Sequence, residues 1–342
     1  MIKIDKLSRN FGSLKAVDEI SFCIRDREIV GFLGPNGAGK TTTLRMMVGY
    51  LQPNSGNIEI DGESIFADPL KASRQIGYLP EQNPLYDDMT VFEALAYFAS
   101  LRRLKRDYFQ ERKKFVVKNC GLKEVLFQRI GTLSKGYRQR TGLAQAILHD
   151  PRILILDEPT SGLDPNQIIE IRELIRNLGK EKMVLLSSHI MQEVQALCDR
   201  VVIINKGKII VDDAIEKLPG YLKRSKILNL EVQGENIDFS SFLALHPSLE
   251  LEILSQDETS CKIVFYETPE IDLRQELSRF ISDKGWLILE LSTSKMSLES
   301  IFYELTGADS NESELVEKAI QEEISPQEQN EPEAEEEIKE QQ

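Results

Sequence analysis

The nine residues from Gly34 to Thr42 most constrain what this chain can fold into. They read Gly-Pro-Asn-Gly-Ala-Gly-Lys-Thr-Thr and fit the pattern GxxxxGK[ST]. The preceding run, Glu28 to Leu33, is mostly apolar and predicts a strand, and a helix is expected to begin near Lys40. A strand, a glycine-rich turn and a helix N-terminus in this order bind a phosphate group. The chain is therefore expected to contain an α/β sheet and to bind a nucleoside triphosphate.

Most positions of this loop have an expected contact with the nucleotide. The backbone N–H groups of Gly37, Ala38, Gly39 and Lys40 are expected to converge on phosphate oxygens. The Lys40 side chain would reach the β- and γ-phosphates, and the hydroxyl of the next residue, Thr41, would ligate magnesium. The remaining residues of the predicted nucleotide contact are Gly34, Asn36 and Thr42. The loop alone does not separate transporters, GTPases and helicases.

A second motif, residues 153–160, reads Ile-Leu-Ile-Leu-Asp-Glu-Pro-Thr. A short run of large aliphatic residues predicts a parallel strand that is buried on both faces. Ligands of such sheets bind at the carboxyl ends of the strands, so Asp157 and Glu158 are expected beside the phosphate loop. Asp157 would hold magnesium, and Glu158 would act as the general base toward the attacking water. The alternative is an acidic helix cap after a core strand.

Four further motifs follow the loop in a fixed order. They are Gln82 in Tyr78–Pro84, Leu-Ser-Lys-Gly-Tyr-Arg-Gln-Arg at 133–140, Ser-Gly-Leu-Asp at 161–164, and His189 after the apolar run 183–186. With the two motifs above, this order resembles that of the ATP-binding-cassette (ABC) ATPases. The resemblance covers residues 1 to about 218. It implies a P-loop NTPase core with an antiparallel β subdomain and a helical subdomain, and it implies ATP and Mg²⁺ as cofactors.

The resemblance implies a role for four residues that have ordinary explanations when taken alone. Phe11 matches the aromatic residue that stacks on adenine, although this position is usually tyrosine, and Gln82 matches the glutamine that senses magnesium and the attacking water. His189 matches the histidine that hydrogen-bonds the γ-phosphate, and Asp164 matches an aspartate at the contact between two protomers. Without the resemblance these would be a core residue, a turn residue, a structural histidine and a helix cap.

Ser134 and Gly136 match the family signature, which binds the γ-phosphate held by a second copy of the chain. The resemblance therefore implies that the active site is completed in trans by a homodimer. This sequence departs from the usual Leu-Ser-Gly-Gly-Gln in having Lys135 and Tyr137. Its version resembles that of exporters of the ABC-2 type. Ser134 as the cap of the following helix is the local alternative.

Charge is distributed unevenly along the 342 residues, whose formal net charge is -14. Residues 309–342 contain 13 acidic residues and two lysines, so the preceding body is nearly neutral. Such a tail is expected to be disordered, either as an interaction arm or as a solubilising extension. A basic run at 102–114 is expected to be a solvated helix face, with a nucleic-acid or lipid-headgroup patch as the alternative.

The remaining organisation is read from local patterns. Strands at 2–4, 18–22 and 28–30 are expected to form the antiparallel sheet on the adenine side, and the helical subdomain is expected at about 88–145. Residues 1–218 would form the ATP-binding domain and 308–342 the disordered tail. Residues 219–307 would form an accessory α+β domain of the order β-α-β-β-α-β, which suggests a ferredoxin-like fold.

These observations predict an ATP-hydrolysing subunit of an ABC-2-type export system. Four cysteines without metal-ligand spacing are expected to be reduced thiols in the cytosol, and no run of 18 uninterrupted apolar residues predicts a membrane span. The resemblance implies a peripheral protein on the cytoplasmic face of the membrane. The expected partners are a second copy and multi-span membrane permease subunits, with no nucleic acid. One alternative is a soluble ABC ATPase that acts on ribosomes or DNA. Another is a nucleotide-gated module without turnover.

Overall fold

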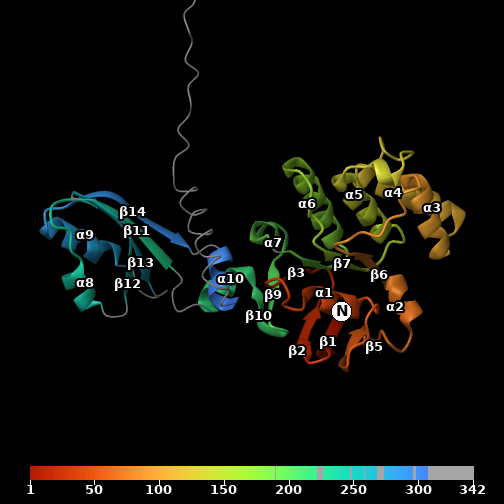
Figure 1. The fold of residues 1–342 in the computed structure, drawn as a ribbon, viewed down its shortest axis with the longest axis horizontal. Coiled ribbons are helices and arrows are strands. Elements are labelled where there is room, and N and C mark those ends of the chain that lie inside the picture. Colours follow the sequence, from red (N-terminus) through yellow and green to blue (C-terminus); the bar gives the residue numbers. More distant parts are fainter. Residues whose placement is uncertain are drawn as a thin grey trace, which may run out of the picture. The chain divides into compact units, whose positions relative to one another are not determined.

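The structure is a computed structural model that describes residues 1–188, 190–221, 226–246, 249–257, 259–267, 273–295 and 298–306. In these ranges the strands form a central six-stranded sheet and two four-stranded sheets. Figure 1 shows the order of the elements along the chain.

The central sheet is mostly parallel and has the strand order β10-β9-β3-β8-β7-β6. Its strands are β3 (Ile29–Leu33), β6 (Ile76–Leu79), β7 (Ile153–Asp157), β8 (Met183–Ser187), β9 (Arg200–Asn205) and β10 (Lys208–Ala214). Every residue of β3, β7 and β8 is buried, which is the expected pattern of strands covered on both faces. The predictions of a strand before the phosphate loop and of a buried strand that ends in Asp157 are therefore confirmed.

A second sheet is antiparallel and has the order β2-β1-β4-β5. Its strands are β1 (Ile2–Phe11), β2 (Leu14–Ile24), β4 (Ser55–Ile60) and β5 (Glu63–Ser64). The first two strands are longer than predicted. The assignment of residues 28–30 to this sheet is wrong, because β3 pairs in parallel with β8 and β9 of the central sheet. The unbroken apolar run of β3 fits a strand buried on both faces, whereas β1 and β2 each expose one face.

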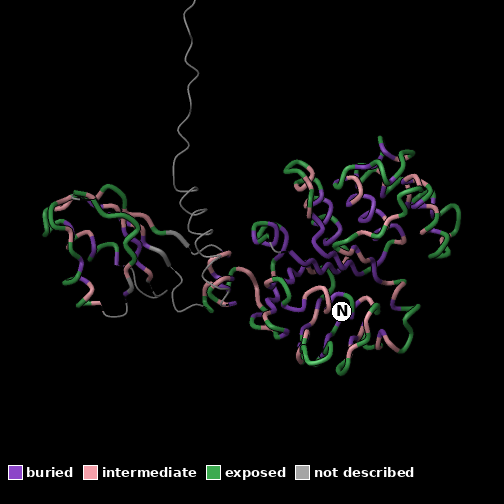
Figure 2. The backbone as a smooth tube through the Cα atoms, in the orientation of Figure 1, coloured by how far each residue is buried: buried purple, intermediate pink, exposed green. Residues whose placement is uncertain are grey.

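Helices cover the central sheet and extend from it (Figure 1). They are α1 (Lys40–Met47), α2 (Pro69–Gln75), α3 (Val91–Leu101), α4 (Arg106–Asn119), η1 (Ile130–Thr132), α5 (Lys135–Ile147), α6 (Pro165–Gly179) and α7 (Met191–Leu197). One core cluster lies between the central and antiparallel sheets and includes α1. A second cluster joins the other face of the central sheet to helices α3 to α7. In Figure 2 the buried residues are concentrated along the central strands.

The following part of the chain contains a third sheet with its own core. The elements of this part of the chain are η2 (Ile215–Tyr221), β11 (Lys226–Gln233), α8 (Ser240–Leu245), β12 (Glu250–Gln256), β13 (Ser260–Glu267), α9 (Arg274–Asp283) and β14 (Leu287–Lys295). The order from β11 to β14 is β-α-β-β-α-β, and the strands lie side by side as β12-β13-β11-β14. Residues such as Phe242, Phe265 and Leu277 fill the core between this sheet and its two helices.

The last described helix, α10 (Leu298–Thr306), packs with the part of the chain that contains the central sheet. Its Leu298, Ile301 and Phe302 belong to the same buried cluster as α6 and α7, although the sequence places them in the accessory unit. The Asn205 side-chain amide also donates to the carbonyl oxygen of Thr306 at 2.7 Å. The expected tail, 308–342, lies outside the described residues. Within the described ranges, no helix has the length and apolar character that crossing a membrane requires.

Candidate active site

The parallel register of three neighbouring strands brings the phosphate loop and the two acidic residues to one edge of the sheet. The loop follows β3, and Asp157 ends β7. β8 lies between these strands, and its last residue, Ser187, is the register partner of Asp157. The carboxyl ends of parallel strands are where α/β sheets bind their ligands. The structure thus brings together the residues that the sequence assigns to phosphate, metal and water.

The phosphate loop depends on glycine where the backbone passes close to other residues. Gly39 has φ 107°, and a Cβ atom there would lie 2.3 Å from the carbonyl oxygen of Ala16. A Cβ atom on Gly34 would lie at the same distance from the carbonyl oxygen of Ile204. Space is open around Gly37, which is exposed together with Asn36. The loop is therefore anchored at Gly34 and Gly39, and its tip is accessible to a ligand.

Lys40 begins α1 and lies over its own loop. Its Nζ donates to the carbonyl oxygens of Gly34 at 2.6 Å and Pro35 at 3.2 Å. Burial lowers the pKa of Lys40, and the charges of Glu158 and Asp157 oppose that shift. The first turn of α1 contains no acidic residue, and the helix has no side-chain cap. A cation and free helix-terminal N–H groups therefore face this edge of the sheet, as phosphate binding requires.

Thr41, Thr42 and Ala38 complete the predicted contacts of the loop. Both threonines are half-buried in the first turn of α1, and Ala38 is buried. The next residue, Thr43, is directed into the protein, where its hydroxyl donates to the carbonyl oxygen of Gly39 at 2.9 Å. Thr43 thus fixes the helix start and leaves the first two threonines as the accessible hydroxyls.

Asp157 is buried and is only partly satisfied by hydrogen bonds. Its Oδ1 accepts from the Ser187 hydroxyl at 2.5 Å. Its Oδ2 is buried and has no hydrogen-bond partner among the residues that the structure describes. Burial and, to a smaller extent, the nearby Asp157 charge raise the pKa of Tyr78 to about 12. A buried carboxylate oxygen without a partner is suited to a hard divalent cation such as Mg²⁺.

Glu158 lies immediately after β7 in an unusual backbone conformation. Its φ is 50°, in the left-handed region, and it precedes Pro159. Its backbone N–H donates to the hydroxyl of Ser187 at 3.1 Å and to the carbonyl oxygen of Ser187 at 3.3 Å. Left-handed geometry is costly for a residue with a side chain and is concentrated at functional sites. The backbone at Glu158 is therefore held in this conformation at some cost in stability.

Two supporting residues were not predicted from the sequence. Ser187 connects Asp157 and Glu158 through one hydroxyl. Glu193, 1% exposed, accepts from the hydroxyls of Thr160 and Ser188. Arg172 lies at 3.9 Å from the same carboxylate. Hydroxyls at the ends of β7 and β8 are the only sequence signal for this network, and the spacing of these residues does not show that they meet.

The signature residues and Asp164 lie on neighbouring helix starts. Ser134 caps α5, where its Oγ accepts from the N–H of Tyr137 at 3.4 Å. Asp164 caps α6 in a reciprocal bond with Gln167, so the predicted helix-cap role of Asp164 is present. Gly136 packs against Gln167, since a Cβ atom there would lie 2.3 Å from Oε1. Ser134 and Asp164 are therefore exposed at two neighbouring helix N-termini, whereas Gly136 is buried against the Gln167 side chain.

The three other predicted site residues are Gln82, Phe11 and His189. Gln82 is exposed and lines a groove of about 570 Å³. Phe11 is 47% exposed, and the guanidinium carbon of Arg9 lies 5.0 Å from the centre of its ring. His189 lies outside the described residues. Phe11 thus offers an accessible ring, as a stacking residue must.

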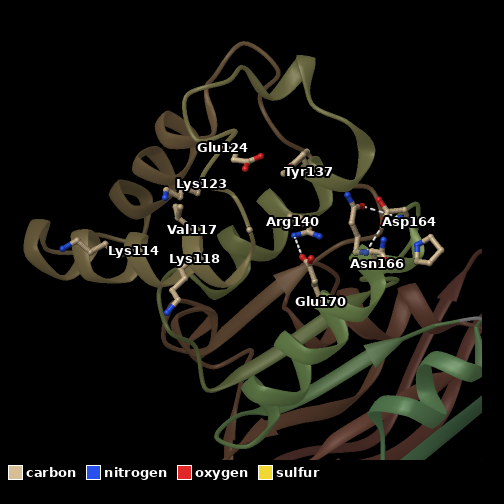
Figure 3. Close-up of a pocket in the computed structure, with 13 residues that line it drawn as sticks. Lys114, Val117, Lys118, Lys123, Glu124, Tyr137, Arg140, Asp164, Asn166 and Glu170 are labelled. Atoms are coloured by element: carbon tan, nitrogen blue, oxygen red, sulfur yellow. Dashed lines mark hydrogen bonds and ion pairs between the residues drawn. The ribbon is translucent and has the colours of Figure 1, made fainter.

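A cavity of about 870 Å³ lies away from the phosphate loop, between α4, α5 and the start of α6 (Figure 3). Arg140 and Glu170 form an ion pair of 2.9 Å beside it. Asp164 also lines it but is engaged in its helix cap. We assign the chemistry to the sheet edge, because the phosphate loop and the acidic pair meet there and not at this cavity.

Comparison with known proteins gives a consistent result. The family model described as ABC transporter matches residues 17–161. The chain is 36% identical to the uncharacterized ABC transporter ATP-binding protein YhcH of Bacillus subtilis (strain 168), over 91% of this chain and 98% of that protein. It is 34% identical to the bacitracin transport ATP-binding protein BcrA of Bacillus licheniformis, over 90% of this chain and 97% of that protein.

A solved structure extends the comparison to the fold. It is described as the ATP binding subunit of an ABC transporter and superposes with a TM-score of 0.61 and 28% sequence identity. The match covers 65% of this chain and 92% of that chain.

Proposed function

Because this chain belongs to the ABC transporter family of ATP-binding proteins and is an ATPase, we propose that two copies of it drive export through separate ABC-2-type membrane subunits. The observation that carries the proposal is the convergence of Lys40, Asp157 and Glu158 at the end of the central sheet. Full-length similarity to a bacitracin transport protein supports export as the process. The chain would then act as a peripheral protein on the cytoplasmic face of the membrane.

Hydrolysis in this proposal uses the residues at the sheet edge. The loop N–H groups and Lys40 bind the phosphates, and the accessible ring of Phe11 supports the adenine. Asp157 and Thr41 would hold Mg²⁺, with Gln82 nearby, and the ion would neutralise charge on the phosphates. Glu158 accepts the proton of the attacking water, and His189 hydrogen-bonds the γ-phosphate.

The dimer follows from the signature surface. Ser134 and Lys135 are exposed, and the N-terminus of α5 offers N–H groups that can bind an anion. A second copy, placed so that its nucleotide faces Ser134 and Gly136, would cover the γ-phosphate. Asp164 lies on the same surface and would contact the partner. ATP thus joins the two copies, and hydrolysis releases them.

The membrane subunit is proposed to dock in the groove beside Gln82. Apolar side chains line it, and Tyr50 and Leu101 are 80% and 60% exposed. Asn83 lies between this groove and α5, where its Nδ2 donates to the carbonyl oxygen of Arg138 at 3.0 Å. A partner in the groove would therefore contact Asn83, which lies next to Gln82 and is bonded to α5. A docking helix with apolar side chains fits such a surface.

We propose that residues 226–295 form a ferredoxin-like accessory domain. The element order and the strand order β12-β13-β11-β14 support this assignment. The proposed role of this domain is regulation or dimer contact, with passive stabilisation as the alternative. The acidic residues 309–342 are proposed to be a disordered extension.

The hydrolytic assignment is tested with Glu158→Gln. A positioned base typically contributes 10²–10⁴ in rate, so turnover of ATP should fall by about that factor while nucleotide binding is retained. Glu173→Gln, which changes an exposed carboxylate on α6, is the matched control and should hydrolyse ATP normally. Unchanged turnover in Glu158→Gln would refute the assigned base.

Export and docking are tested by purification from solubilised membranes. The full chain should recover a multi-span membrane protein, and Leu101→Asp should lose it while keeping basal ATP hydrolysis. Leu70→Asp, at another exposed helical leucine, should behave as the unmodified chain. Recovery of ribosomes or DNA without any membrane protein would support the soluble alternative and overturn the proposal.

A further inference from the structure

We propose that Gln139 is a positioning residue that holds the catalytic glutamate in its left-handed backbone conformation. Gln139 lies one turn into α5 and is 7% exposed. Its Nε2 donates to the carbonyl oxygens of Glu158 at 3.2 Å and Pro159 at 3.3 Å. The proposal rests on the assignment of Glu158 as the general base.

The turn after β7 needs external support. Glu158 has φ 50°, a left-handed conformation that is costly for a residue with a side chain, and the following proline normally restricts the preceding residue to the extended region. From the β8 side, the backbone N–H of Glu158 is held by Ser187. On the other side of the Glu158 Cα atom, the carbonyl oxygen of Glu158 accepts from Gln139. Ser161 closes the turn by donating its N–H to the same oxygen at 3.2 Å.

Gln139 differs from the other two supports because it belongs to α5. Ser187 and Ser161 lie on β8 and in the turn itself, which are parts of the sheet edge. A displacement of α5 would leave their bonds in place but would remove both bonds of Gln139. The conformation of Glu158 therefore depends on the position of this helix.

The same helix contacts the surfaces that are proposed to sense ligands. Its N-terminus holds Ser134 and Gly136, and Gly136 packs on Gln167 at the start of α6. Asn83, next to Gln82, donates from its side-chain amide to the carbonyl oxygen of Arg138. The Asn83 side chain also packs closely on Gly142, where a Cβ atom would overlap it. Gln139 lies on α5 between these contacts. Engagement of the signature or of the groove can thus alter the alignment of Glu158 through one side chain.

The burial of Gln139 makes its two bonds consequential. A buried amide that loses its partners is costly, so the side chain is held in this orientation while α5 stays in place. Methionine at this position would conserve length and packing but would offer no donor. Ionised glutamate would place acceptors against two carbonyl oxygens, whereas protonated glutamate would regain one donor.

The test compares the steady-state kinetics of Gln139→Met and Gln139→Glu in the full chain. For Gln139→Met, kcat should fall about tenfold or more, with KM for ATP within about twofold of the original value. Gln139→Glu should lose activity at pH 8 and regain part of it, relative to the original chain, as the pH falls toward 5.5. Thr141→Val is the control, because it removes a part-buried hydrogen bond of 2.7 Å within α5 that does not reach Glu158.

A double-mutant cycle separates positioning from a structural role. In the Glu158→Gln background, Gln139→Met should cause no further loss of the residual rate. Equal losses in both backgrounds, or an unchanged kcat in Gln139→Met, would overturn the proposal. Should Gln139→Met fail to fold, the relative pH response of Gln139→Glu decides, and a flat response counts against the proposal. If Glu158→Gln itself keeps full turnover, the assigned base is wrong independently of Gln139.

Discussion

The hydroxyl of Ser187 provides a quantitative test of how the acidic pair is held. Ser187 is fully buried, donates to Asp157 at 2.5 Å and accepts from the N–H of Glu158 at 3.1 Å. A bond to a charged acceptor is worth about 1.5–3 kcal/mol, and a neutral bond about 0.5–1.5 kcal/mol. The N–H of Glu158 keeps its bond to the carbonyl oxygen of Ser187, so losing its neutral bond to the hydroxyl costs an amount at the lower end of that range. Ser187→Ala should therefore destabilise the protein by about 2–4 kcal/mol.

Equilibrium unfolding in urea measures this loss, and thermal unfolding should show a midpoint lowered by roughly 5–15 °C. Turnover of ATP should also fall, since the variant loosens the backbone N–H of Glu158 and frees both oxygens of Asp157. Ser73→Ala removes an exposed bond of 3.1 Å on α2 and should change the unfolding free energy by less than about 0.5 kcal/mol. A Ser187→Ala variant as stable and active as the original chain would refute the network.

Two further predictions concern buried titratable groups. Burial, aided by the charge of Arg102, lowers the pKa of His149 to about 4, so between about pH 6.5 and pH 4 the unfolded chain takes up this proton and the folded chain does not. Through this group, the unfolding free energy should fall by at most about 3 kcal/mol between pH 6.5 and pH 4. In His149→Gln, the unfolding free energy should depend less steeply on pH over the same range. Equal slopes for the variant and the original chain would contradict the prediction. Burial also raises the pKa of Cys120 to about 12 and raises the pKa of Cys198 and Cys261. In native protein at pH 8, iodoacetamide should alkylate the half-buried Cys23 first, as read by peptide mass spectrometry, and modification of Cys120 at the same rate would contradict this.

The parts of the site that the sequence predicts are those that depend on local spacing. The phosphate loop, the strand before Asp157 and the helix starts at Ser134 and Asp164 are each specified within about ten residues of sequence. The meeting of the phosphate loop and Asp157 at one sheet edge follows from a general rule for parallel sheets. These elements are therefore predictable from the amino-acid sequence alone.

The parts that the sequence did not predict depend on tertiary register. Ser187 matters because it is the strand partner of Asp157, and Gln139 matters because α5 packs over the turn after β7. The sheet assignment of residues 28–30 failed for a related reason, since the neighbours of a strand are not encoded in its own residues. Burial on both faces of β3, visible as an unbroken apolar run, was the available signal. The core to which α10 belongs was likewise not readable from its amphipathic pattern.

The central claim is that ATP joins two copies of this chain and that each copy completes the active site of the other. The direct measurement is the mass of the Glu158→Gln chain in solution, with and without ATP and Mg²⁺, by size-exclusion chromatography with light scattering. The account predicts a species of 39.0 kDa without nucleotide and twice that mass with ATP, and it predicts that Ser134→Arg prevents the change while retaining ATP binding. A Glu158→Gln chain that binds ATP and remains at 39.0 kDa would contradict the account.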